Sequence, residues 1–182
     1  MLTRRPDDLG EWLADGAAFD AAGAAVLCLG LAPQPELDPL ALTAALAAVT
    51  FRSLLVTSLP APEGPAVDRT LATIEQLSHG RLRILADAIP SGPLAGLALR
   101  LGVFRRIPGD PEVFEHVRGP DEAQRWVSVP APDSRAAWRQ TTLDAAGHGF
   151  GGLLVPAGPR LLDILRNPGD QGGRHDLQLA QG

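Results

Sequence analysis

Apolar positions in the first part of the chain follow two different spacings. Leu9, Trp12 and Phe19 lie at mostly helical spacing, which predicts a helix over residues 8–22. The apolar run at 24–29 is short and uninterrupted and lies between two glycines, as is typical of a strand buried on both faces of a parallel sheet. A helix followed at once by a buried strand is therefore the first unit of the expected fold.

The same helix-to-strand unit occurs twice more. Residues 40–49 predict a second helix because they are rich in alanine, and residues 53–59 predict a second strand. Residues 67–77 and 81–86 predict the third helix and strand, with Gly80 placed for a left-handed cap between them. Three such units indicate a mainly parallel sheet with right-handed crossovers, and hence the α/β fold class.

The pattern is less regular after residue 90. The expected elements are a helix at 94–101, β-prone segments that form either a hairpin or an irregular insertion at 103–107 and 113–117, a strand at 125–129, a helix at 135–146, a strand at 150–155 and a helix at 160–166. The polar, glycine-rich tail at 168–182 is expected to be flexible. A chain of 182 residues suits one core, so we predict a single domain spanning 1–182.

One segment is more specific than this general alternation. Residues 70–82, TLATIEQLSHGRL, join the third helix to the third strand, and the tripeptide TFR at 50–52 joins the second helix to the second strand. Together with the helix at 37–50, these segments resemble the luciferase-like, flavin-dependent monooxygenase family, in a shortened form. The glycine-containing run GFGG at 149–152, ahead of the last strand, is a looser similarity.

The resemblance implies a TIM-like (β/α)₈ barrel, here truncated or incomplete, with mainly parallel strands and an irregular middle region. A full barrel takes about 250 residues. The family also implies a flavin, FMN or a deazaflavin, at the carboxyl ends of the strands. We expect Thr57, Ser58 and Asp87 to bind it, the alternative for each being an ordinary polar residue at a strand end. The turn at 78–81 lies at the opposite ends of the strands, so we expect its polar residues to be architectural.

Two functions follow from the resemblance. The first is a flavin-binding, luciferase-like oxidoreductase or monooxygenase of unknown substrate, in which the cofactor performs the redox chemistry. The alternative is a non-catalytic relative that acts as a ligand-binding or dimerising interaction module. An open sheet has edges that must be paired or covered, so we expect a homodimer, with the apolar segment 94–103 as a hypothetical contact. A third reading is an unrelated small α/β protein.

Charge and composition exclude several classes of partner. The net charge is −5 and the chain has no long basic run, so it lacks the electrostatic footprint of a nucleic-acid-binding protein. No stretch approaches the roughly 20 apolar residues that a membrane helix needs. The single cysteine, Cys28, lies in an apolar run and has no partner for an internal disulfide, and we expect a cytoplasmic protein.

Other residues with reactive or charged side chains are scattered. The four histidines have no metal-ligand spacing, so no metal is expected. We expect His116 on the surface of a β-prone segment and His148 in a solvated turn. Arg105, Arg106 and Arg118 are candidates to pair with an anionic group such as a flavin phosphate, or are exposed arginines of a hairpin.

Overall fold

A computed structural model describes residues 8–29, 37–59, 65–88, 95–109, 111–119 and 122–168. Within these residues the chain forms seven strands and six helices. The strands are β1 (Val26–Cys28), β2 (Leu54–Ser58), β3 (Leu82–Ala86), β4 (Val103–Ile107), β5 (Val113–Gly119), β6 (Glu122–Ser128) and β7 (Gly152–Leu154). The helices are α1 (Leu9–Ala21), α2 (Pro39–Val49), α3 (Pro65–Leu77), α4 (Ala95–Leu101), α5 (Arg135–Gly147) and α6 (Pro159–Arg166).

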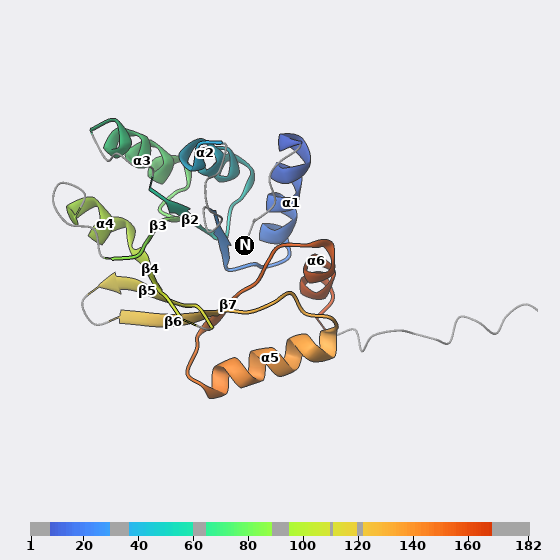
Figure 1. The fold of residues 1–182 in the computed structure, drawn as a ribbon. Helices are drawn as coiled ribbons and strands as arrows, with labels where there is room; N and C mark the ends of the chain where they lie inside the picture. Colours follow the sequence, from blue (N-terminus) through green and yellow to red (C-terminus); the bar gives the residue numbers. More distant parts are fainter. Residues whose placement is uncertain are drawn as a thin grey trace, which may run out of the picture.

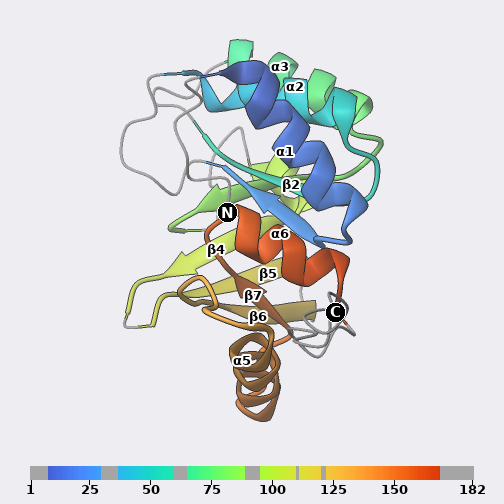
Figure 2. The ribbon, with the colours of Figure 1, turned by 90° about the vertical axis from the view of Figure 1, so that its right-hand side faces the viewer.

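The strands form one sheet in which their order in space is their order in the chain. Strands β1 to β4 are parallel, β5 is antiparallel to both of its neighbours, and β7 is parallel to β6. Figures 1 and 2 show that this sheet curls and that the helices cover its outer side, with α5 at the far end from α2 and α3. The result is an α/β half-barrel, as expected in outline from the sequence.

Short-range chemistry explains where several helices begin. The carboxylate of Asp8 accepts the N–H groups of Gly10 and Glu11 at 2.6 and 3.2 Å, and Asp38 caps α2 in the same way. Ser134 accepts the N–H of Ala137 at 3.0 Å at the start of α5. Each cap satisfies backbone donors that have no partner within the helix.

The middle of the chain forms a hairpin, which decides between the two structures open from the sequence. Phe104 of β4 lies opposite His116 of β5, which in turn lies opposite Gln124 of β6. Strand β6 therefore begins at Glu122, three residues before the predicted start at 125. Residues 122–124 are recruited by backbone pairing with β5, because Glu122, Ala123 and Gln124 have low intrinsic strand propensity and gave no apolar signal for a strand.

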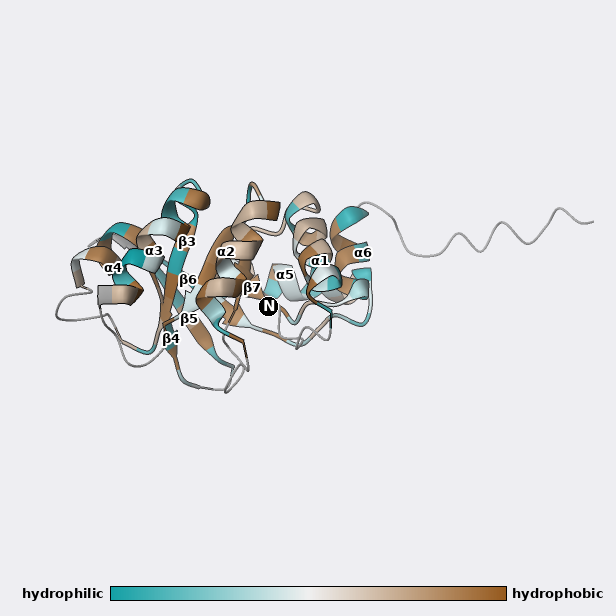
Figure 3. Ribbon diagram, turned by 90° about the horizontal axis from the view of Figure 1, so that it is seen from above, coloured by the Kyte–Doolittle hydropathy of each residue, from teal (hydrophilic) through white to brown (hydrophobic). Residues whose placement is uncertain are grey.

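The sheet has two buried faces. Its outer face packs under the helices in two clusters, one around Leu27 and Leu55 beneath α1, α2 and α6, the other around Leu82 and Ile84 beneath α3 and α4. Its concave face carries a third cluster, formed by Cys28, Val56, Leu85, Phe104, Phe114, Trp126 and Leu154. Figure 3 shows hydrophobic residues along α1, α2 and the strands, whereas α5 is mostly pale or hydrophilic.

Candidate functional site

The residues predicted to bind a cofactor do not share one face of the sheet. Thr57 is completely buried and pairs in register with Ile84, which belongs to the helix-covered face. Its hydroxyl lies 3.5 Å from the carbonyl oxygen of Pro39, at the start of α2, and 3.4 Å from that of Ser58. The side chain of Thr57 therefore faces α2, away from the concave side.

Ser58 and Asp87 lie on or above the concave face, at the carboxyl ends of adjacent strands. Ser58 is half-buried and pairs with Leu85, two residues before Asp87. The carboxylate of Asp87 accepts a hydrogen bond from Nε of Arg106 at 2.7 Å, and Oε1 of Glu112 lies 3.7 Å from the same nitrogen. The hydrogen bond with Asp87 raises the pKa of Arg106, with Glu112 adding to the effect against the opposing effect of burial. Two carboxylates thus lie beside the single positive charge of Arg106.

Beneath these strand ends, aromatic side chains fill the curled sheet. The rings of Phe104 and His116 are stacked with centroids 4.4 Å apart, and the indole of Trp126 meets Phe104 edge-on at 5.7 Å. His116 is only 5% exposed, so its expected place on the surface was wrong. The reason is alternation along β5, because His116 and Phe114 are two residues apart and face the same concave side.

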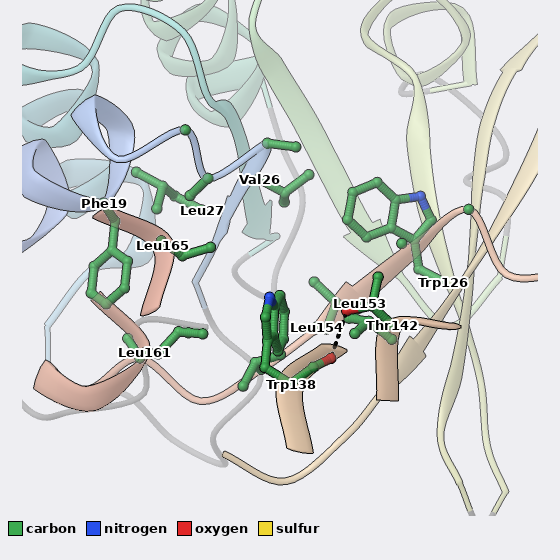
Figure 4. Close-up of a pocket in the computed structure, with 17 residues that line it drawn as sticks. Phe19, Val26, Leu27, Trp126, Trp138, Thr142, Leu153, Leu154, Leu161 and Leu165 are labelled. Carbon is green, nitrogen blue, oxygen red and sulfur yellow. Dashed lines mark hydrogen bonds between the residues drawn. The ribbon is translucent and has the colours of Figure 1, made fainter. Parts of the chain in front are cut away.

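An apolar cavity of about 280 Å³ lies between β1 and β7, the two edge strands of the sheet. We call it the seam cavity. Figure 4 shows Val26 of β1 and Leu153 of β7 on opposite sides of it, with Trp138 of α5 on a third side. Leu161 and Leu165 of α6 form a further wall. Elements from the N-terminal and the C-terminal parts of the described chain therefore bound the cavity.

Glycine and tryptophan shape the wall on the β7 side. A Cβ on Gly152 would lie 2.4 Å from Cε3 of Trp126, so the indole lies directly on the backbone of that residue. The indole N–H of Trp126 donates to Oε1 of Gln124 at 3.3 Å, which holds the ring. On α5, the hydroxyl of Thr142 donates to the carbonyl of Trp138 at 2.8 Å, as drawn in Figure 4. Of the two lining tryptophans, Trp126 is thus held by a hydrogen bond to its ring, whereas the bond from Thr142 reaches only the backbone of Trp138.

The turn segments behind the family resemblance are locked together by buried charge. Asp20 of α1 accepts the N–H groups of Phe51, Arg52 and Ser53 at 2.9, 3.0 and 2.6 Å. Although burial alone would raise the pKa of Asp20, these hydrogen bonds outweigh it and the pKa is lowered. The interaction fixes the connection between α2 and β2.

Arg81 holds the other side of the same connection. It is 9% exposed, and its guanidinium donates to the carbonyls of Ser78, Ser53, Thr50 and Ala47. The architectural role predicted for this turn is confirmed for Arg81 and for Ser78, which is fully buried.

The remaining sequence candidates fall outside these sites. His148 is exposed in the turn after α5, as predicted, with Nδ1 2.7 Å from the carbonyl oxygen of Asp144. Arg105 pairs with Glu115 across the hairpin, and the side chain of Arg118 lies outside the described residues. Among the described residues, no three His, Cys, Asp or Glu side chains are arranged to hold a metal ion. No described helix is long and apolar enough to cross a membrane.

Sequence reasoning missed the seam cavity. Its walls come from α1, β1, β6, α5, β7 and α6, so no single window of the sequence contains it. Two features of the sequence could have indicated a cavity wall: the glycine pair 151–152 at the start of a strand, and the tryptophans at 126 and 138. No model of a protein family, no curated protein and no solved structure matches the chain.

Proposed function

We propose that this chain is a luciferase-like relative that works as a ligand-binding module. The observation that carries the proposal is the seam cavity, a half-enclosed apolar space between two strand edges. Concave apolar cavities are where proteins hold small molecules. The resemblance of residues 70–82 and the curled, helix-covered sheet support the family assignment.

The strand ends are less suited to the family's cofactor. A flavin phosphate needs cationic or backbone donors, whereas Arg106 is already bound by Asp87 and approached by Glu112. Below them, Phe104 and Phe114 are almost completely buried and fill the concave side. These described residues do not fit a flavin phosphate.

A flavin-binding oxidoreductase or monooxygenase is the second candidate function. Ser58 and Asp87 favour it, because they lie at the carboxyl ends of neighbouring parallel strands, where barrel enzymes bind cofactors. In that case FMN or a deazaflavin would supply the redox chemistry, and the side chains would position it.

Titration with FMN and with a deazaflavin separates the two candidates. We expect no saturable change in flavin absorbance and no rise in melting temperature with either cofactor. A saturable change that is lost in Ser58→Ala but kept in Thr57→Val would instead support the oxidoreductase. Thr57 is the matched control, because its side chain lies under α2.

We also propose that the module forms a homodimer. In the segment 94–103, Leu101 and Val103 belong to the core, whereas Leu99 is 65% exposed. The contact would therefore centre on α4 around Leu99. Size-exclusion chromatography with light scattering should show a dimer that Leu99→Glu dissociates, and a monomer at all concentrations would contradict the proposal.

A further inference from the structure

We infer that the seam cavity binds one small, neutral aromatic molecule of about ten to twelve non-hydrogen atoms. This inference rests on the proposed binding function and names the chemical class of its ligand. The charge of the walls, the volume, the position of the tryptophans and the route of entry all indicate such a ligand.

The walls of the cavity set the charge of the ligand. The lining side chains are apolar except for the hydroxyl of Thr142 and the indole N–H groups of the two tryptophans, and none carries a charge. That hydroxyl already donates to the carbonyl of Trp138. An ionised ligand would lose its hydration and find no opposite charge on the lining side chains, which is strongly unfavourable. A neutral ligand loses little water and gains apolar contact.

The volume sets the size of the ligand. An apolar cavity of about 150 Å³ holds one benzene ring in another protein. The seam cavity, at about 280 Å³, is nearly twice as large. Two fused rings with one small substituent therefore fit, whereas a flavin with its side chain does not.

Two indoles favour an aromatic ligand over an aliphatic one. Trp126 and Trp138 both line the cavity, and aromatic rings attract one another in stacked or edge-on geometry beyond the effect of buried area. Figure 4 shows the nitrogen end of Trp138 turned into the cavity. That N–H can donate to a single oxygen on the ligand, which would fix the orientation of the ring.

Thr142 marks the route of entry. It lines the cavity, yet it is exposed on α5, so the cavity opens to solvent beside it. The neighbouring Leu143 is 67% exposed and does not line the cavity. A larger side chain at position 142 should close the opening, whereas the same change at position 143 should not.

The test uses 1-naphthol as the neutral probe and naphthalene-1-sulfonate as an anionic probe of similar ring size. The chain has three tryptophans, and Trp12 does not line the cavity. The titration is monitored through the indole N–H signals in ¹⁵N NMR spectra. Adding 1-naphthol should shift the signals of Trp126 and Trp138 saturably and leave the signal of Trp12 unchanged. The sulfonate should bind at least about tenfold more weakly. Thr142→Phe should weaken 1-naphthol binding about tenfold or more, and Leu143→Phe should leave it unchanged.

Each other outcome overturns the inference. Equal binding of the anionic probe would show a ligand site of another chemistry, so the binding function would stand while the neutral class would be wrong. Equal shifts of all three indoles, or none, would show that the cavity is not the site. Signals of Trp126 and Trp138 that shift with protein concentration alone would show that a second copy fills the cavity. The flavin titration tests the oxidoreductase alternative separately.

Discussion

Replacing Asp20 with asparagine should destabilise the fold, and the loss should depend on pH. Asp20 is 4% exposed and accepts three backbone N–H groups from the turn between α2 and β2. In the wild type, Oδ1 binds the N–H groups of Arg52 and Ser53, and Oδ2 binds that of Phe51. The asparagine amide has one oxygen, so its NH₂ group would face a backbone donor.

The size of the effect follows from these contacts. A hydrogen bond to a charged group contributes about 1.5–3 kcal/mol to stability. The substitution removes one such bond outright and takes the charge from the other two, and it also removes the attraction between Asp20 and Arg81. We expect the free energy of unfolding to fall by about 2 kcal/mol at pH 7, which lowers the melting temperature by about 4–8 °C for a chain of this size.

The pH dependence has a definite sign. The pKa of Asp20 is lower in the folded state than the value of about 3.9 in an unfolded chain. Its stabilisation is therefore complete above pH 4 and is lost as the pH falls through the lowered folded-state pKa. The difference in stability between wild type and Asp20→Asn should thus be largest near neutral pH and shrink in acid.

Urea unfolding followed by far-ultraviolet circular dichroism at pH 7, 5 and 3 measures this difference. Asp15→Asn is the matched control, because Asp15 is exposed on the same helix, and it should change stability by less than about 0.5 kcal/mol. A loss of less than about 0.5 kcal/mol in Asp20→Asn at pH 7 would refute the reasoning. So would a difference that is the same at all three pH values.

Three further predictions test the turn, the cavity wall and the buried thiol. Arg81→Met should lower the free energy of unfolding in urea by about 3 kcal/mol or more, because four carbonyls lose their donor. Arg81→Lys should not restore the lost stability, since one ammonium cannot reach all four carbonyls. Full rescue by lysine would contradict this expectation. Gly152→Val should lower the free energy of unfolding by about 1–3 kcal/mol and shift the indole N–H signal of Trp126. Gly158→Ala should do neither, because open space surrounds Gly158. An unshifted signal in Gly152→Val would show that the indole can move away from the new side chain. Burial raises the pKa of the Cys28 thiol to about 12. An aromatic disulfide reagent at pH 8 should therefore label Cys28 only as fast as the protein unfolds. Labelling at the rate of a free peptide thiol would disprove the burial of Cys28. Because the folded-state pKa lies above the unfolded value of about 8.5, the stability due to this thiol is complete below that pH and is lost as the pH rises toward 12.

The sequence by itself determined the local elements and their order. Asp38 and Ser134 cap α2 and α5, and these caps are local because a cap needs only a side chain and the next few backbone N–H groups. The apolar runs gave β1, β2 and β3 because a strand covered on both faces needs apolar residues throughout. The role of Arg81 was also readable, since a polar turn opposite the carboxyl ends of the strands has an architectural use.

The tertiary structure alone decided which side chains share a surface. Thr57 and Ser58 are neighbours in the sequence but face opposite sides of the sheet, and His116 is buried because it faces the concave side and stacks on Phe104. The seam cavity joins Phe19 to Leu165, which no local pattern connects. Helix and strand formation depend on neighbouring residues, whereas burial and cavities depend on how distant segments pack, so the fold class was predictable and the cavity was not.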